Sequence, residues 1–200
     1  MAHLDELIGE LKQKDIAEKT FLQCFPKTGL EAIAREAKED PVLLIGGSKE
    51  ERDALRDSKL INLDYISMQG VDVVADAEEM PFRKPMFKHA VMYNLLEILY
   101  NPKKVFENVH KSLKKGGIFW VGNHLAGYTQ GYNLRWAPTR IDIKEFEERG
   151  LVFYTDGIDR YGISKEYINH LYKISGFEHV HFVDEKVIDN TRYVLASGSK

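Results

Sequence analysis

The chain has 200 residues, of which 44% are hydrophobic and 30% are charged, and its formal net charge is −3. This length suits one domain with a sizeable core, and the composition is that of a globular protein. The balanced charge provides no global positive field for nucleic acid, so we expect no nucleic-acid partner. A single cysteine, Cys24, excludes an intrachain disulfide.

The first 40 residues have the pattern of two helices. Four apolar residues recur at helical spacing near the N-terminus: Leu4, Leu7, Ile8 and Leu11. A second short helix is expected over "GLEAIAREAKED", residues 29–40. The N-terminal stretch is acidic and amphipathic, unlike a secretory signal peptide, and no apolar run reaches the roughly eighteen residues of a membrane helix. We therefore expect a cytoplasmic protein without membrane association.

From residue 41 onward, strand patterns alternate with helix patterns. Strands are expected at "PVLLIG" (41–46), "KLINLDYI" (59–66), "VDVVAD" (71–76), "FKHAVMYNLL" (87–96), "IFWVGNH" (118–124), "HVHFVDEKV" (179–187) and "TRYVLASG" (191–198). Helices are expected at "SKEERDALRD" (48–57), "PKKVFENVHKSLKKGG" (102–117) and "SKEYINHLYKISGF" (164–177). This alternation predicts an α/β fold, with a mostly parallel central sheet and helices on both faces. Such sheets bind ligands at the carboxyl ends of their strands.

The turn after the first strand, "VLLIGGSKE" (42–50), contains a glycine pair. Gly46 and Gly47 allow a tight turn and a close approach of a ligand to the backbone. Ser48 and Glu51 have the spacing of a capping box, so a helix begins there. Asp64 follows the second strand, eighteen residues after Gly46, where an acid can accept hydrogen bonds from ribose hydroxyls. A plain tight turn and a solvated loop carboxylate are the alternative interpretations.

Three further motifs support a family assignment. They are Asp76 before Pro81 and Phe82, Leu96 with Glu97 after a strand, and Leu113, Lys114, Gly116 and Gly117 before the next strand. In these motifs the chain resembles the Rossmann-like, S-adenosylmethionine-dependent methyltransferases, and more narrowly the small type 11 group. The resemblance covers residues 42 to about 122 and, more loosely, 160 to 180. It implies a Rossmann-like methyltransferase fold whose sheet ends in an antiparallel C-terminal strand.

The resemblance also implies a cofactor, S-adenosyl-L-methionine, and the residues that hold it. These are Gly46 and Gly47 under the methionine part, Asp64 at the ribose diol, Asp76 at the adenine amino group, Ala77 with a backbone N–H beside it, and Asn94 near the sulfonium. Hydrogen bonds from the sugar and base suit carboxylate acceptors.

The chain departs from the family pattern around the glycine turn. Leu44 stands where the family usually has an acid, and Ser48 and Glu50 stand where it usually has glycines. Ile98 replaces a common histidine, and the helix after the second strand is shortened to "YISMQG". Glu50 could lie near the carboxylate of the cofactor, which is unfavourable. Alternatively, Ser48 and Glu51 cap the helix and Glu50 points to water.

The long irregular stretch at about residues 122 to 160 is expected to cover the pocket and bind the acceptor. His124 directly follows the fifth strand and is a candidate base, and Asp159 is a second catalytic candidate; a lone histidine is more often structural. Four residues are candidates for substrate binding: Tyr128, Arg135, Trp136 and Arg160. The histidines show no metal-ligand spacing with carboxylates or cysteine, so no metal is expected.

These observations predict one methyltransferase-like domain over residues 1–200. It would comprise N-terminal helices at 1–40, a cofactor-binding half at 41–122, a substrate or lid loop at 123–160, and a C-terminal helix with strands at 161–200. The expected function is methyl transfer to a small molecule, by O-methylation of a saccharide or natural-product-type acceptor. The alternative is a protein of this fold without methyl transfer, acting as a binding or partner subunit or in different chemistry.

Overall fold

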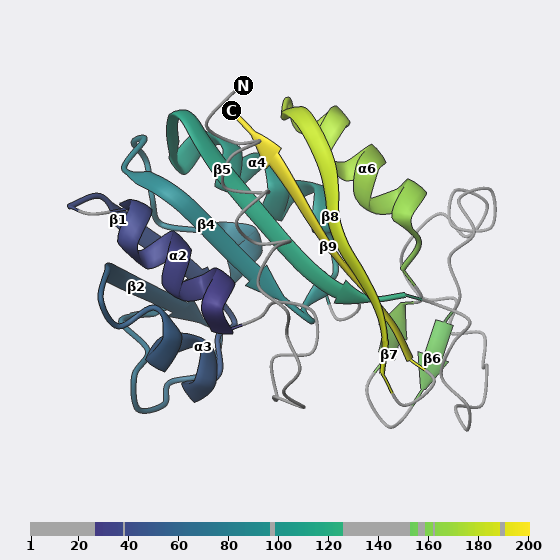
Figure 1. Ribbon diagram of the computed structural model, residues 1–200, viewed down its shortest axis with the longest axis horizontal. Helices are drawn as coiled ribbons and strands as arrows, with labels where there is room; N and C mark the ends of the chain where they lie inside the picture. The colour runs from purple at the N-terminus through teal and green to yellow at the C-terminus, as the bar shows by residue number, and fades with distance from the viewer. Residues whose placement is uncertain are drawn as a thin grey trace.

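The computed structural model describes residues 27–37, 39–96, 99–125, 153–155, 159–161, 163–188 and 191–200 (Figure 1). The described helices are α2 (Lys27–Ala37), α3 (Lys49–Ala54), a short 3-10 helix η1 (Ala77–Glu79), α4 (Pro102–Ser112) and α6 (Lys165–Ile174). The described strands are β1 (Pro41–Ile45), β2 (Lys59–Asp64), β3 (Val73–Val74), β4 (Phe87–Tyr93), β5 (Leu113–His124), β6 (Phe153–Thr155), β7 (Asp159–Tyr161), β8 (Glu178–Ile188) and β9 (Thr191–Ser199). The helix expected around Leu4–Leu11 lies outside the described residues.

Seven of these strands form one sheet in the order β3-β2-β1-β4-β5-β9-β8, and β6 and β7 form a separate antiparallel pair. The pairs among β1 to β5 are parallel, whereas β9 runs antiparallel to both of its neighbours. The predicted Rossmann-like α/β fold is therefore confirmed, including the antiparallel C-terminal strand. The strand order reverses between β1 and β4, which is where open α/β sheets place their ligands.

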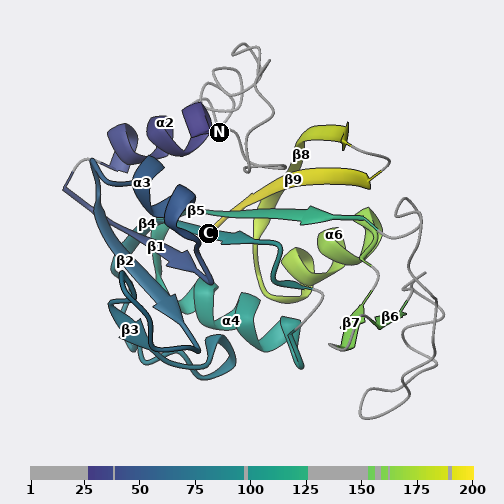
Figure 2. The same cartoon turned by 90° about the horizontal axis from the view of Figure 1, so that it is seen from below.

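Helices cover both faces of the sheet (Figure 2). Alternate residues of β1 enter two separate cores, because successive side chains of a strand point to opposite faces. Val42 and Leu44 pack in one core with residues of α2 and α3, and Leu43 and Ile45 pack in the other with residues of α4 and α6. A strand buried on both faces needs a continuous apolar sequence, which explains the run "VLLI".

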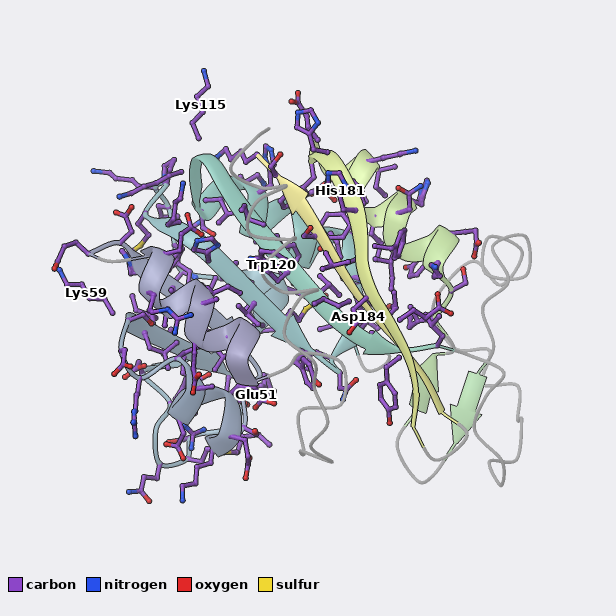
Figure 3. All side chains as sticks on the ribbon, viewed as in Figure 1. Glu51, Lys59, Lys115, Trp120, His181 and Asp184 are labelled. Atoms are coloured by element: carbon purple, nitrogen blue, oxygen red, sulfur yellow. The ribbon has the colours of Figure 1, made fainter. Side chains whose placement is uncertain are left out.

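A chain of polar side chains lies within the core beneath α2. Trp120, labelled in Figure 3, lies on β5. It donates its indole N–H to Nδ1 of His89 on β4, at 3.3 Å, and Oε2 of Glu36 on α2 lies 2.6 Å from His89 Nε2. His89 and Trp120 are fully buried. These contacts connect α2 to the two central strands.

The helix expected over residues 102–117 is shorter than predicted. α4 ends at Ser112, and the residues from Leu113 onward already belong to β5. Their backbone groups are used elsewhere: the N–H of Gly116 donates to the carbonyl of Lys200 at 2.7 Å, and the N–H of Lys200 donates to Gly117 at 2.9 Å. Gly116 has a φ of +71°, a region that favours glycine, within the first residues of β5. The backbone bonds to Lys200 therefore keep Gly116 and Gly117 in β5, where the sequence predicted the end of a helix.

Tyr172 anchors α6 to the sheet. Its side chain is fully buried against Phe106, and its hydroxyl lies 3.0 Å from the carbonyl of Phe119 and 3.3 Å from that of Ala196. Burial disfavours the phenolate and raises the pKa of Tyr172 well above its usual value.

We predict that Tyr172 makes the fold sensitive to alkaline pH. The unfolded chain releases the phenol proton near pH 10, whereas the folded chain retains it. The stability linked to this group is therefore complete below about pH 10 and is lost as the pH rises further. The stability difference between wild type and Tyr172→Phe, about 1 kcal/mol at pH 8, should shrink by pH 11 in denaturant titrations. Tyr65→Phe is the control, because Tyr65 is 76% exposed; a constant difference for Tyr172→Phe would contradict the prediction.

Candidate functional site

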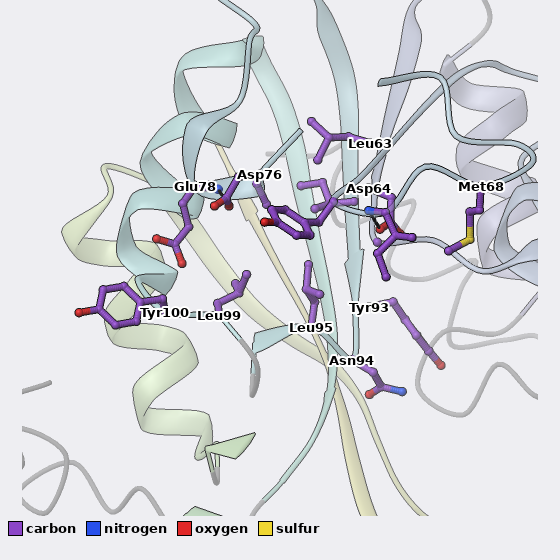
Figure 4. A pocket seen from close by; sticks show the side chains of 15 residues that line it. Leu63, Asp64, Met68, Asp76, Glu78, Tyr93, Asn94, Leu95, Leu99 and Tyr100 are labelled. Carbon is purple, nitrogen blue, oxygen red and sulfur yellow. Dashed lines mark hydrogen bonds between the residues drawn. The ribbon is translucent and has the colours of Figure 1, made fainter. Parts of the chain in front are cut away.

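A pocket of about 550 Å³ opens at the carboxyl ends of the central parallel strands (Figure 4). Ile45, Asp64 and Tyr93, the last residues of β1, β2 and β4, all line it. The pocket thus lies beside the β1–β4 reversal of strand order, at the edge that the sequence predicted. Of the predicted cofactor residues, the structure brings Gly46, Asp64, Asp76, Ala77 and Asn94 together in its walls.

Gly46 forms the floor of the pocket between two strands. Its N–H donates to the carbonyl of Leu63 at 2.9 Å, and its φ is +67°, a region that favours glycine. A Cβ atom at this position would lie 3.3 Å from the side chain of Leu95, which also lines the pocket. The turn after β1 and the loop after β4 are therefore in direct contact.

Gly47 has a different role, because it is not among the described residues that line the pocket. A Cβ atom at Gly47 would lie 2.1 Å from Cδ2 of Leu44. Leu44 is fully buried in the core beneath α2 and α3. The second glycine of the turn is thus required by the packing of the leucine that replaces the usual acid of the family.

The capping box predicted at the start of α3 is present. The N–H of Ser48 donates to Oε2 of Glu51 at 2.6 Å, and the hydroxyl of Ser48 also bonds to this carboxylate. Glu51 is 3% exposed, whereas Glu50 is exposed and accepts from the Ser48 hydroxyl at 2.8 Å. That bond lowers the pKa of Glu50. Glu50 points to water and not into the pocket, as the second interpretation of this segment expected.

Two carboxylates project from neighbouring strand ends into the pocket. Oδ1 of Asp64 accepts from the N–H of Ile66 at 2.9 Å, and Oδ1 of Asp76 accepts from the N–H of Glu78 at 2.8 Å. Both are local bonds that fix the orientation of the side chain. In the part of the chain that the structure describes, the second oxygen of each carboxylate has no protein partner. Both oxygens are thus available to a ligand that donates hydrogen bonds.

Glu78 is a pocket residue that the sequence analysis missed. Its Oε1 accepts from the N–H of Asn101 at 2.6 Å, and its carbonyl accepts from Nδ2 of Asn108 at 2.9 Å. These bonds tie η1, which follows Asp76, to α4 and to Asn101, the residue that caps the start of α4. The only sequence signal was its position two residues after Asp76, where it was not distinguished from a solvated charge.

Apolar side chains complete the walls, and they too were missed. They are strongly exposed: Tyr65 76%, Ile66 59%, Met68 49% and Tyr100 53%. All four line the pocket, and Tyr65 and Ile66 directly follow Asp64. Flat, exposed apolar surfaces beside hydrogen-bond acceptors suit an aromatic base attached to a polar sugar.

The loop after β4 is held from β5. Asn94 has a φ of +42°, and its N–H donates to the carbonyl of Gly122 at 2.8 Å. The fully buried Asn123 accepts from the N–H of Leu96 at 3.4 Å through its side-chain oxygen. Asn123 thus helps to hold Asn94 and Leu95 against the pocket, which no sequence motif indicated.

The predicted catalytic and acceptor-binding residues are only partly described. His124 is the last residue of β5, and Asp159 and Arg160 belong to β7, but their side chains lie outside the described part of the structure. Tyr128, Arg135, Trp136 and most of the predicted lid loop at 123–160 also lie outside it. Among the described residues, no group of three or more His, Cys, Asp or Glu could hold a metal ion.

Comparisons with known proteins agree with this geometry. A family model described as a methyltransferase domain matches residues 46–121, and no curated protein matches the chain. A solved S-adenosylmethionine-dependent methyltransferase from Mesorhizobium loti has a TM-score of 0.60 at 16% identity, over 86% of this chain and 96% of that one.

Two further solved structures contain the cofactor or its product. The 1,6-didemethyltoxoflavin-N1-methyltransferase of Burkholderia thailandensis, with S-adenosylhomocysteine and 1,6-didemethyltoxoflavin bound, has a TM-score of 0.59 at 13% identity, over 87% of this chain and 77% of that one. Phosphoethanolamine N-methyltransferase 2 of Haemonchus contortus, with S-adenosyl-L-methionine, has a TM-score of 0.58 at 13% identity, over 96% of this chain and 56% of that one. At these identities the likeness concerns the fold.

The family match and the fold confirm the predicted resemblance to type 11 methyltransferases, and they agree with S-adenosyl-L-methionine as the cofactor. The acceptor, the roles of individual site residues, the cytoplasmic location and the lack of a nucleic-acid partner stay predictions. Within the described residues, no helix has the length and apolar character needed to cross a membrane.

We predict that Gly47 and Leu44 are energetically coupled. Gly47→Ala should destabilise the fold by about 1–3 kcal/mol, because the new methyl group overlaps Leu44. In a Leu44→Ala background, which itself costs about 2–5 kcal/mol, the same change should cost almost nothing. The check is a double-mutant cycle by denaturant unfolding. Leu43→Ala is the matched control, because Leu43 packs on the opposite face; additive costs for Gly47 and Leu44 would refute the coupling.

Proposed function

We propose that the chain is an S-adenosylmethionine-dependent methyltransferase, and that its pocket binds S-adenosyl-L-methionine for methyl transfer to a small molecule. The observation that carries the proposal is the pair of carboxylates, Asp64 and Asp76, which line one pocket from neighbouring strand ends and each keep one oxygen available. The cofactor offers two ribose hydroxyls and an adenine amino group as donors, so its donors match these acceptors.

The other walls also fit the cofactor. Tyr65, Ile66 and Tyr100 provide apolar surface for the adenine ring, and Ala77 lies buried beside Asp76. Gly46 has no side chain, so the ligand can lie close to the backbone at the end of β1. When bound, the cofactor supplies a methyl group on a positively charged sulfur. The residues of the chain hold its adenosine part and keep it oriented toward the acceptor.

We propose a hydroxyl group of a saccharide or natural-product-type molecule as the acceptor. Alignment contributes most to such a transfer, and a base assists when a hydroxyl group reacts. His124, the last residue of β5, would take the hydroxyl proton, with Asp159 as a second candidate. Tyr128, Arg135, Trp136 and Arg160 would hold the acceptor, because aromatic and guanidinium groups suit sugar rings and their hydroxyls. Transfer of labelled methyl groups to a panel of sugars and phenols tests this proposal, and methylation of amines alone would overturn it.

A second candidate function rests on the altered glycine turn. Leu44 replaces the usual acid, and Glu51 uses the N–H of Ser48. A protein of this fold without methyl transfer, acting as a binding or partner subunit or in different chemistry, is compatible with these features. Addition of millimolar cofactor separates the two candidates. A working pocket raises the melting temperature, whereas an unchanged melting temperature favours the second candidate.

We predict that Asp64→Ala weakens cofactor binding by about 1.5–3 kcal/mol, because it removes an acceptor from a bound ligand. The fold should be unaffected, since the Asp64 side chain is only partly buried and its hydrogen bond to the N–H of Ile66 is local. Calorimetric titration with S-adenosylhomocysteine measures the change. Asp57→Ala is the matched control, because the Asp57 side chain is 77% exposed outside the pocket. Equal affinities of wild type and Asp64→Ala would exclude Asp64 from the site.

A further inference from the structure

The hydrogen bonds at the start of α3 affect which part of the cofactor the pocket can recognise. The cofactor has two halves, an adenosine with hydrogen-bond donors and an amino acid that ends in a carboxylate. Backbone N–H groups at the start of a helix ordinarily attract such an anion. Here the N–H of Ser48 is bonded to Oε2 of Glu51 at 2.6 Å, so it is not available.

The charges around this turn disfavour the binding of a ligand carboxylate. Glu51 is 3% exposed and Glu50 accepts from the Ser48 hydroxyl at 2.8 Å, so two carboxylates lie next to the turn that carries Gly46. The neighbouring cation, Arg52, donates from Nη1 to the carbonyl of Gly47 at 3.1 Å. Its guanidinium group also lies against Gly70, where an added Cβ would be 2.6 Å from Nε. Arg52 is thus held away from the pocket walls.

The pocket walls themselves are acidic. Among the described lining residues, the charged side chains are those of Asp64, Asp76 and Glu78, and none is basic. A ligand carboxylate finds no positive partner in these walls, whereas the ammonium group of the same amino acid is compatible with them. In the amino-acid half of the ligand, these walls therefore disfavour the carboxylate and accommodate the ammonium group, so the two effects oppose each other. The favourable contacts are concentrated on the adenosine half.

We propose that this pocket recognises the adenosine half of its ligand and gains little from the amino-acid half, so that it binds simpler 5′-thioadenosines about as tightly as S-adenosylhomocysteine. This inference rests on the proposed function and specifies its ligand class. It makes Glu51 a specificity-determining residue, because its carboxylate accepts from the N–H of Ser48 and carries a negative charge beside the turn that contributes Gly46 to the pocket.

The test compares two ligands that share adenosine and sulfur but differ in the amino acid. Calorimetric titrations with S-adenosylhomocysteine and 5′-methylthioadenosine should give dissociation constants within about threefold of each other in the wild type. Binding of 5′-methylthioadenosine that is tenfold weaker or more would overturn the inference and leave the proposed function standing. If neither ligand binds, the proposed function fails, and the inference fails with it.

Glu51→Gln sharpens the test, because an amide oxygen still accepts from Ser48 but carries no charge. The variant should bind S-adenosylhomocysteine several-fold more tightly and 5′-methylthioadenosine unchanged. Equal changes for both ligands would indicate a structural effect and overturn the role of Glu51. Glu50→Gln, at the exposed position, should also tighten the binding of S-adenosylhomocysteine, but by less. It replaces Glu51→Gln in the test if that variant does not fold. Asp53→Asn removes a charge from the exposed side of α3 and should change neither affinity.

Discussion

β1 is hydrogen-bonded to β2 on one edge and to β4 on the other, and this central position determines where the other elements lie. A strand buried on both faces favours apolar side chains, and in this chain Leu44 is as buried as its neighbours. Because Leu44 reaches beneath the turn that follows, residue 47 must be glycine. The path of the chain out of β1, the start of α3 and the floor of the pocket all follow from this packing.

The pocket is built on short connections between rigid elements. Asp64 and Asp76 end or follow strands of the sheet, and local bonds to Ile66 and Glu78 orient their carboxylates. Glu78 in turn connects η1 to α4 through Asn101. Acceptors held in this manner lose little conformational freedom when a ligand binds, which favours affinity.

The residues that depart from the family pattern at the glycine turn support one another through packing and hydrogen bonds. The usual family pattern combines an acid on the first strand with several glycines, whereas this chain combines a buried leucine with a capped helix. Glu51 satisfies the N–H of Ser48, and Leu44 fills the space beneath the turn. The adenosine side of the pocket retains its acceptors, and the change is concentrated where the amino-acid half of a cofactor would lie. An altered turn is therefore compatible with a pocket that still binds a nucleoside.

The fold class was predictable from the sequence, because the alternation of apolar strands and amphipathic helices reflects burial that any such sheet requires. The position of Asp64 was predictable because carboxyl ends of parallel strands meet at one edge, and that of Asp76 was implied by the resemblance to the methyltransferase family. The boundary of α4 was not, since residues after Ser112 follow bonds to Lys200, which is distant in sequence.

The sequence by itself determined the α/β fold class, the acidic residues at the strand ends and the capping box at Ser48, because each depends on local spacing or on a pattern common to the fold. Only the tertiary structure decided that Gly46 faces the pocket while Gly47 accommodates Leu44, and that Glu78, Tyr100 and Asn123 support the site. These roles depend on which side chains meet across strands and turns, and such contacts leave no periodic signal in the sequence.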